Sequence, residues 1–466
     1  MHREQTTIVI GGGLAGLWLT AHIPAAVCLE ASDRVGGRIR SAYADDGTLV
    51  YETGPWRIPE NHARMLHLCA ECGIALQPLA TPTPSLPMDP PPVAGLSIWG
   101  VNALAHGPQE ADRRDLATAY ADQTASASGS SPYTTHAGRH WTAPAGFSAL
   151  AEALAHGRDV RLRQRVVDLQ RAPDGSYEVR VCARSGHNEF REHILRADVV
   201  FVCVPPDVCR GWTLLAAHAK SVLHAVEAGP LHHIYAWHER PPVRRHVVDS
   251  TSLVTQCISS QYGNGWFQAS YTAGRVARLW HDLALSNPGE LHARLRQGVR
   301  RLFGLRLPEG APVRSHFWPV AYHQWRPVPH FELQRAVQLA VRPSPHHLPR
   351  VYLAGEALSS HQAWMEGALE TAELALAASC ADEFAPPATF RRGPPSSEPS
   401  PTDDLSVRVE GHVLDVARWA HVHPGGIAAL RNHAGEDVTD LMTHIHHSAH
   451  AWAVVHSLKK TPPEHG

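Results

Sequence analysis

The chain has 466 residues, more than one ordinary hydrophobic core holds, so two or three domains are expected. An apolar fraction of 44% and a charged fraction of 18% are typical of a folded chain and exclude general disorder. The formal net charge of -2 provides no strong field for nucleic acid or an anionic membrane, so nucleic-acid binding is not expected.

The beginning of the chain and its cysteines indicate where the protein resides. The opening "MHREQTTIVIGGG" passes from a charged start directly into a predicted strand and leaves no room for a signal peptide. No apolar run reaches the roughly 18 residues expected of a transmembrane span. The close cysteine pair, Cys69 and Cys72, lacks a second pair and predicts buried thiols on a helix rather than a zinc site. We therefore expect a cytoplasmic protein with reduced thiols and leave its oligomeric state open.

A dinucleotide-binding pattern follows at once. "TTIVIGGGLAGLWLTAHI" combines a β-branched strand, glycines at G-x-G-x-x-G spacing and a helical run. The first glycine allows a tight turn, the second lets a pyrophosphate approach the backbone, and the third lets helix and strand pack closely. The next predicted strand ends in an acidic residue that can bind the 2′-OH of an unphosphorylated adenosine ribose. The expected cofactor contacts are Gly11, Gly13, Leu14, Ala15, Gly16, Glu30 and Ala31.

The segment "EASDRVGGR" adds two more glycines and two arginines. It resembles the "E-A-x-x-R-x-G-G-R" signature of the FAD-dependent amine oxidase superfamily, which includes monoamine and polyamine oxidases, protoporphyrinogen oxidase and phytoene desaturases. The resemblance implies that Arg34 and Arg38 lie near the FAD phosphates and ribityl chain, and that "YETGPWRIP" passes beside the flavin. Further cofactor contacts implied here are Gly36, Gly37, Gly54, Pro55, Trp56 and Arg57.

Later stretches resemble the same family in chain order, so the resemblance covers roughly residues 5–380. "APAGFSALAEALA" resembles the turn and helix that return to the FAD domain, and "ADVVFVCVPPDV" is a buried strand that ends in Pro-Pro. "VRLRQRVVDLQRAPDGSYEVRVCA" reads as strand, strand, turn, strand. The resemblance implies that the backbone at Val167 meets the adenine.

The last of these stretches is "RVYLAGEALSSHQAWMEGALETAELALAA". A helix that begins near Met365 aims free backbone N–H groups outward. The resemblance implies that these groups meet the pyrimidine edge of the flavin and stabilise negative charge there. The implied cofactor contacts are Gly355, Glu356, Trp364, Met365 and Ala368.

Between these motifs, residues 231–330 carry the pattern of a separate sheet. "HHIYAWHE", "STSLVTQCISS" and "NGWFQASYTAG" alternate like strands of an antiparallel sheet. "HFWPVAYHQWRP" resembles the family stretch that leads to the substrate face of the flavin. Candidate walls of the substrate pocket are therefore Trp318, Tyr322, Trp325 and Trp364, which could bracket an amine by apolar and cation–π contact. For each tryptophan, a place in the ordinary core is the alternative.

Two departures from the family matter. Most amine oxidases of this family place a lysine near flavin N5, whereas "GPLHHIYAWHERP" offers His232 or His233. We take His233 together with Trp318, Tyr322 and Trp364 as the candidate catalytic residues. No cysteine is clearly placed for covalent flavin attachment, so non-covalent FAD is expected.

The C-terminal part follows a Pro/Ser-rich spacer without periodicity. In it, "VEGHVLDVARW" reads as strand, turn, strand, "HPGG" opens a helix, and Gly435 interrupts the pattern before another helix. These segments resemble the cytochrome b5 haem-binding domain. The resemblance implies a haem b with two axial imidazoles, and its spacing selects His423 and His447 as the iron ligands. The alternative is a histidine-rich zinc site, although a catalytic zinc normally takes three compactly arranged protein ligands.

The expected fold is therefore α/β plus α+β. A Rossmann-like FAD-binding domain carries an antiparallel-sheet substrate domain, and a small cytochrome b5-like α+β domain follows. The predicted divisions are an amine oxidase-like domain (1–384), a linker (385–403) and a haem domain (404–466). Within the first, FAD-binding parts are expected at about 1–80, 143–215 and 335–384, and substrate-domain parts at about 81–142 and 216–334.

The predicted function is FAD-dependent oxidation of an amine C–N bond or a related C–C bond by hydride transfer to flavin. The tethered haem would relay single electrons, and molecular oxygen or a one-electron carrier would be the acceptor. One alternative is a C–C dehydrogenase of the carotenoid or protoporphyrinogen type, favoured by a long apolar pocket. The other is a non-catalytic flavin–haem electron carrier or redox sensor. The sequence identifies the substrate only as a small molecule.

Overall fold

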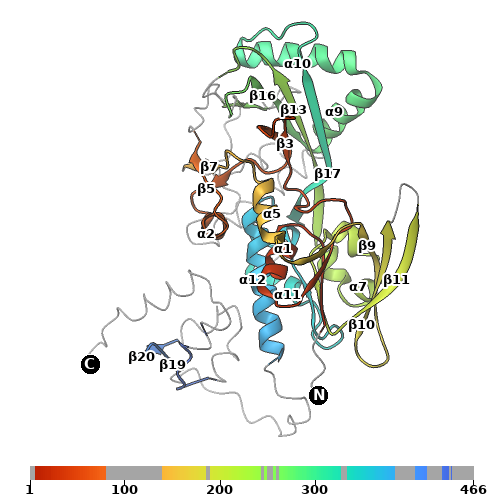
Figure 1. The fold of residues 1–466 in the computed structure, drawn as a ribbon, viewed down its shortest axis with the longest axis vertical. Helices are drawn as coiled ribbons and strands as arrows, with labels where there is room; N and C mark the ends of the chain where they lie inside the picture. Colours follow the sequence, from red (N-terminus) through yellow and green to blue (C-terminus); the bar gives the residue numbers. More distant parts are fainter. Residues whose placement is uncertain are drawn as a thin grey trace. The chain divides into compact units, whose positions relative to one another are not determined.

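The computed structural model describes residues 6–79, 139–184, 189–242, 246–248, 256–258, 262–326, 333–383, 405–416, 433–439 and 442. These residues belong to two compact units, 1–372 and 373–466. Figure 1 shows the helices and strands of both.

A five-stranded sheet organises the first unit, in the order β18-β12-β1-β2-β8 with every neighbouring pair parallel. Its strands are β1 (Thr7–Ile10), β2 (Val27–Leu29), β8 (Asp159–Arg161), β12 (Val199–Val202) and β18 (Val351–Leu353). The central strands read TIVI and VVFV and are buried throughout, as expected of a sheet covered on both faces. The helices that accompany this sheet include α1 (Leu14–His22), α5 (Ser148–Ala155) and α12 (Met365–Glu383).

Parallel pairing brings the carboxyl ends of these strands to one edge of the sheet. The turns after β1, β2, β12 and β18 therefore lie near each other although they are distant in sequence. Ligands of open α/β sheets bind at this kind of edge.

An antiparallel sheet forms the other large element of the first unit, in the order β14-β15-β16-β13-β17. Its strands are β13 (Val226–Trp237), β14 (His246–Val248), β15 (Gln256–Ile258), β16 (Trp266–Ala273) and β17 (Val313–Trp325). Two helices, α9 (Gly274–Ser286) and α10 (Pro288–Phe303), cover one face of it (Figure 1). Side chains such as Ile234, Phe267 and Ala269 pack there against Trp280 and Leu295.

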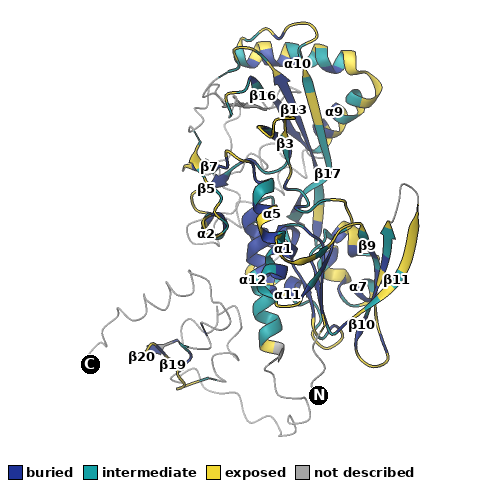
Figure 2. Ribbon diagram, viewed as in Figure 1, coloured by how far each residue is buried: buried dark blue, intermediate teal, exposed yellow. Residues whose placement is uncertain are grey.

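The alternation of β13 and β16 explains why this sheet has two different faces. His233 alternates with the helix-facing Ile234 and points to the other face, and Tyr271 lies opposite His233 because the β13–β16 register shifts at Ala269. Figure 2 shows both strands as buried and the outward sides of α9 and α10 as exposed. The second face is therefore also covered, and it contributes to the cavity described below.

Smaller elements complete the first unit. A three-stranded antiparallel sheet has the order β11-β10-β9, with β9 (Gln164–Arg171), β10 (Tyr177–Arg184) and β11 (Phe190–Ala197). The hairpin β3 (Ser41–Tyr43) and β4 (Leu49–Glu52) and the small sheet of β5 (Ile58–Pro59), β6 (Gln77–Pro78) and β7 (His140–Thr142) accompany α2 (Ala63–Glu71). The remaining helical segments are α6 (Pro206–Cys209), α7 (Thr213–His218), α8 (Lys220–Leu223), α11 (Leu333–Val341) and the 3₁₀ helix η1 (Glu356–Leu358).

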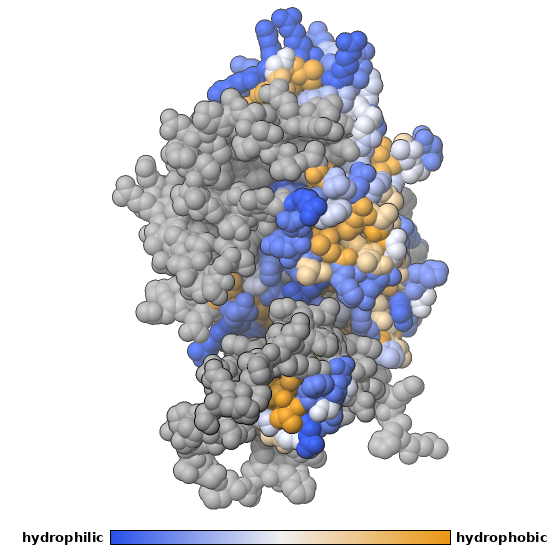
Figure 3. Space-filling model, turned by 90° about the vertical axis from the view of Figure 1, so that its left-hand side faces the viewer, coloured by the Kyte–Doolittle hydropathy of each residue, from blue (hydrophilic) through white to orange (hydrophobic). Residues whose placement is uncertain are grey.

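The surface around α10 is strongly polar. Hydrophilic side chains dominate this end of the face drawn in Figure 3, consistent with the many arginines of α10. Within the described parts of the chain, every helix is too short or too polar to cross a membrane.

The second unit contains a hairpin of β19 (Ser406–Val409) and β20 (His412–Asp415), which confirms the predicted strand-turn-strand pattern. Its two-residue turn, Glu410 and Gly411, has positive φ at both positions, as the twist of a tight hairpin requires. Gly435 also has a positive φ, of 79°. The predicted linker (385–403) and the predicted iron ligands His423 and His447 lie outside the described residues.

Candidate active site

A cavity of about 580 Å³ is lined by the carboxyl edge of the parallel sheet and by the second face of the antiparallel sheet. Almost all residues predicted to contact a cofactor line it: Gly11, Gly13, Leu14, Ala15, Glu30, Ala31, Gly36, Gly37, Arg38, Gly54, Pro55, Trp56, Arg57, Gly355, Glu356, Trp364, Met365 and Ala368. Three do not line the cavity, namely Gly16, Arg34 and Val167. The fold thus gathers segments from both ends of the first unit.

The glycine loop after β1 has the geometry of a phosphate cradle. Gly11 has a φ of +109°, and a Cβ there would approach the Cys203 carbonyl oxygen to 2.9 Å. A Cβ at Gly16 would collide with the Gly11 carbonyl oxygen, so Gly16 serves helix–strand packing and lies away from the cavity. At Gly13 a Cβ would meet nothing within 4 Å, and the residue caps the N-terminus of α1 without a side-chain hydrogen bond. Open space beside free helix N–H groups fits an anionic diphosphate.

Glu30 follows β2 at the same edge. Its Oε2 accepts a hydrogen bond from the Gly12 N–H at 2.7 Å, and its Oε1 accepts one from the Ser32 N–H at 2.8 Å. These bonds hold the carboxylate at the cavity wall, where each oxygen keeps a further lone pair for a ligand hydroxyl.

The two arginines of the "EASDRVGGR" segment have different environments. Arg34 donates to the carbonyl oxygens of Val35, Gly37 and Ile39, at 2.9, 2.6 and 3.0 Å. Its guanidinium therefore holds its own loop in shape and does not line the cavity, and its contact with a cofactor stays a prediction. Arg38 does line the cavity and reaches across the fold to Glu356.

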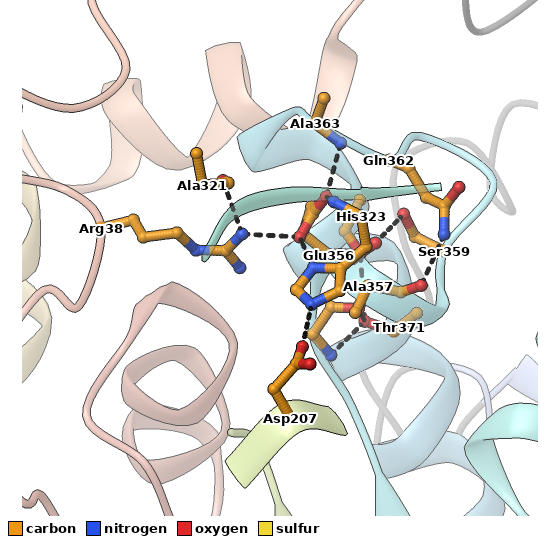
Figure 4. A network of polar contacts seen from close by, with 12 residues as sticks. Arg38, Asp207, Ala321, His323, Glu356, Ala357, Ser359, Gln362, Ala363 and Thr371 are labelled. Atoms are coloured by element: carbon orange, nitrogen blue, oxygen red, sulfur yellow. Dashed lines mark hydrogen bonds and ion pairs between the residues drawn. The ribbon is translucent and has the colours of Figure 1, made fainter. Parts of the chain in front are cut away.

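Glu356 is the centre of a buried polar network (Figure 4). Its carboxylate accepts hydrogen bonds from Arg38 Nη1 at 2.7 Å and from the backbone N–H groups of His323 and Ala363 at 2.9 and 2.6 Å. His323 contacts it through Nδ1 at 3.1 Å and contacts Asp207 through Nε2 at 3.2 Å. Burial alone would raise the Glu356 pKa, but Arg38, His323 and the Ala363 N–H hold it well below its ordinary value. The permanent negative charge of Glu356 therefore joins β17 and the turn after β18 to the loop that carries Arg38.

The paired histidines of β13 lie on opposite faces of the sheet. His232 faces α9, where its Nε2 lies 2.6 Å from the Ser315 hydroxyl and its ring contacts that of His281 edge-on. His233 lines the cavity and packs edge-on against Tyr271, with 4.9 Å between ring centroids. Of the two histidines offered by the sequence, the structure brings His233 to the site.

Arg57 lies between two indoles in the cavity wall. Its guanidinium carbon is 4.6 Å from the centroid of Trp56 and 5.7 Å from that of Trp364. Burial lowers the pKa of Arg57 to about 10, an effect that nearby Tyr271 opposes, so the side chain stays cationic at neutral pH. Trp364 in turn packs edge-on against His62, with 5.0 Å between ring centroids.

Four aromatic residues were predicted to wall the substrate pocket, and two of them do line the cavity. Trp318 and Trp364 line it, and the Trp318 indole donates to the Thr53 carbonyl oxygen at 2.5 Å. Tyr322 does not line the cavity, and it packs in a cluster with Leu231 and Trp318, which do. Trp325 also lies outside the lining and donates to the Ser359 carbonyl oxygen at 2.9 Å.

The cavity lining also differs from the prediction in the register of one strand and in two residues that belong to no predicted motif. On β9 the residues that line the cavity are Gln164, Arg165 and Val166, and Val167 does not line it. Sequence reasoning missed His62 and Tyr271, which both line the cavity. For Tyr271 a signal existed, since the strand pattern of "NGWFQASYTAG" with the correct pairing would place it opposite His233. For His62, which caps α2, no pattern in the sequence pointed to the site.

Comparison with known proteins agrees with this geometry. Residues 19–90 and 115–378 match the model of the family described as flavin containing amine oxidoreductase. The chain therefore belongs to this family, a class of FAD-dependent oxidoreductases. Residues 397–463 match a cytochrome b5-like heme/steroid binding domain, so the chain combines the two.

Two curated relatives share short segments with the chain. One is Delta(8)-fatty-acid desaturase 2 of Arabidopsis thaliana, 46% identical over 57 residues, or 12% of each protein. The other is named "Putative L-amino-acid oxidase YobN", from Bacillus subtilis, and is 44% identical over 66 residues, or 13% of each protein. The chain thus spans only a small share of the length of either relative.

Proposed function

We propose that this flavoprotein oxidises the C–N bond of a small amine whose neighbouring carbon carries a carboxylate, as in an amino acid. The observation that carries the proposal is Arg57. Among the residues that the structure describes, no carboxylate or hydrogen-bond acceptor pairs with this cationic side chain, although it lines the cavity. A guanidinium presents a planar fork that matches a carboxylate, and its stacking between indoles fixes the fork. The name of the relative YobN is consistent with a substrate of this class.

The acidic residues of the lining support the same substrate class. In the described part of the lining the carboxylates are Glu30 and Glu356. Glu356 is already paired with Arg38, and Glu30 is held by two backbone N–H groups at the end of β2. A polyamine would bring a second ammonium group without a matching anion, whereas a monoamine with a carboxylate matches Arg57. An apolar carotenoid-like substrate would leave the partly buried guanidinium unpaired, at a cost in binding.

The residues present fit a dinucleotide, and we propose that FAD binds without a covalent bond in a Rossmann-like arrangement at the parallel sheet. The open cradle at Gly13 would hold the diphosphate, and the Glu30 carboxylate would hold a ribose hydroxyl. Bound FAD supplies the hydride acceptor for C–N oxidation. The described cysteine in the lining, Cys203, has a pKa raised well above its ordinary value by burial, so its thiol is a poor nucleophile. The antiparallel sheet, through His233, Tyr271 and Trp318, would form the substrate side.

We also propose that the C-terminal domain binds haem b through His423 and His447 and passes on electrons singly. The support is the match of residues 397–463 to the cytochrome b5-like family and the spacing of these two histidines. An iron held by two imidazoles is suited to electron transfer because it has no open position for a substrate.

Anaerobic reduction of the flavin band by a substrate panel tests the role of Arg57. Amino acids should bleach the band in the wild-type protein, and the matching amines that lack a carboxylate, such as phenethylamine for phenylalanine, should do so poorly. Arg57→Gln should raise KM for amino acids on the order of 100-fold, about 2.7 kcal/mol, through loss of a charge-assisted pair. Arg57→Lys should retain part of the affinity, since it keeps the charge but not the fork. Equal rates with amino acids and simple amines would contradict the proposal.

A further inference from the structure

The wall of the cavity at His233 contains a polar atom without a partner. His233 is 1% exposed, and its Nε2 has no hydrogen-bond partner in the described structure. The other ring nitrogen, Nδ1, lies 2.8 Å from Nε2 of Gln268, on the neighbouring strand β16. An unpartnered buried polar atom in a cavity wall has a cost unless a ligand satisfies it.

The contact with Gln268 determines which ring nitrogen carries the proton. In the orientation that the structure gives the Gln268 amide, its NH₂ donates to Nδ1 of His233, which places the ring proton on Nε2. A neutral imidazole in this tautomer presents an N–H donor toward the cavity. Gln268 is itself 2% exposed, and in this orientation its Oε1 has no hydrogen-bond partner in the described structure.

The groups around His233 keep the ring neutral. They are Tyr271 from β16, His316 from β17, and Tyr235 and His232 from β13 itself. None of them is an anion at neutral pH that would favour an imidazolium. Burial lowers the pKa of His233 to about 3, with further contributions from His316 and His232. The donor therefore keeps the same form across the physiological pH range.

We propose that Gln268 is a positioning residue that locks His233 as the neutral Nε2–H tautomer, so that the cavity wall presents a permanent hydrogen-bond donor to an acceptor atom of the bound ligand. The acceptor would be an oxygen of the substrate carboxylate or an acceptor atom of the flavin ring. The carboxylate is favoured, because His233, its ring neighbour Tyr271 and the cationic Arg57 all line the same cavity. In this form the inference rests on the proposed function.

Gln268→Glu is the sharpest test, because it replaces the amide donor with an acceptor of nearly the same shape. The introduced carboxylate would draw the ring proton to Nδ1 and leave Nε2 as an acceptor. The dissociation constant of benzoate, used as a simple carboxylate probe, is measured on the FAD-loaded full-length protein between pH 6 and 8.5. Wild type should bind benzoate equally across this range. The variant should bind about tenfold more weakly at pH 8.5 and recover as the pH falls, because a protonated ring donates from both nitrogens.

Two further variants control for folding and for location. His233→Phe keeps a flat ring against Tyr271 and should weaken benzoate binding to a similar extent at every pH. Ser315→Ala removes the partner of His232 on the other face of the sheet, so it should leave the benzoate affinity and its pH profile unchanged. Thermal denaturation of each FAD-loaded variant confirms that it is folded.

The results separate the possible acceptors. A change in benzoate affinity alone assigns the acceptor to the substrate, and a change in the flavin absorption spectrum without benzoate assigns it to the cofactor. If Gln268→Glu and His233→Phe alter neither quantity, the inference is overturned. The proposed function is judged separately by the Arg57 variants, because an altered flavin spectrum does not depend on a carboxylate substrate.

Discussion

At the scale of single residues, two buried carboxyl groups of the first unit have different charges because the groups around them differ. Glu356 has the cation of Arg38 beside it, and its pKa is held well below the ordinary value despite burial. Glu52 accepts hydrogen bonds from the Ser41 hydroxyl and the Phe147 N–H, and no cation among the described residues contributes to its pKa shift. Burial therefore raises its pKa to about 7, against the opposing effect of these two donors. The first group is a permanent anion, and the second titrates near neutrality.

Glu52 should make the stability of the protein depend on pH. Its pKa rises from 4.5 in the unfolded chain to about 7 in the folded one, so the folded state binds the proton more tightly. Stability should therefore fall by roughly 3 kcal/mol as the pH rises through this window and level off above it. Urea unfolding of wild type and Glu52→Gln at several pH values checks this. The free energy of unfolding of wild type relative to Glu52→Gln should fall by this amount as the pH rises through the window. The same pH dependence in both proteins would contradict the prediction.

At this scale the sequence predicted the type of residue better than its partner. The "EASDRVGGR" motif placed both Arg34 and Arg38 near a cofactor. Only the folded chain shows that Arg34 binds three carbonyls of its own loop while Arg38 reaches a residue 318 positions away. Local spacing carries no information about such a distant partner. Gln268 was missed for the same reason, since its role depends on the pairing of β13 with β16.

At the scale of elements, β13 and β17 meet closely at one glycine. Gly229 lies opposite Tyr322, and a Cβ at Gly229 would collide with the tyrosine ring. The missing side chain leaves room for the ring over the neighbouring strand, where Tyr322 packs with Leu231. An aromatic residue over a strand glycine stabilises the pairing by covering the exposed backbone.

Gly229→Ala should therefore destabilise the antiparallel sheet, by about 1–3 kcal/mol, because the tyrosine ring must leave a well-packed position. Denaturant unfolding of the FAD-loaded protein measures the loss. Shortening the opposing side chain as well, in Gly229→Ala with Tyr322→Leu, should recover part of the stability. A double variant no more stable than Gly229→Ala would show that the collision with the ring is not the cause.

The periodicity of "HHIYAWHE" and "NGWFQASYTAG" predicted strands, and β13 and β16 follow these segments. It could not tell which of two adjacent histidines faces the cavity, because alternation alone leaves the choice of face open. The choice depends on where α9 and α10 pack, and this follows from apolar residues far along the chain. Register shifts after Gly229 and Ile234 are also invisible in the pattern.

At the scale of the whole molecule, the chain should give two separable optical signals. Purified protein should show a flavin band and a haem Soret band, and dithionite should bleach the first and shift the second. If His423 is an axial ligand as proposed, His423→Ala should abolish the haem signal while the flavin band persists. A Soret band that survives in both His423→Ala and His447→Ala would show that other residues bind the iron.

The alternation of β13 has a consequence for redesign of the protein. Removing one residue ahead of His233 would slide the following strand by one position and exchange its two faces. Ile234 would then occupy the cavity wall, and the imidazole would be pressed against the helix pair α9 and α10. The side chain that the cavity wall presents to a ligand thus depends on the position of each residue in the alternation of the strand as much as on the residue type. Insertions or deletions in pairs would be tolerated far better than single ones.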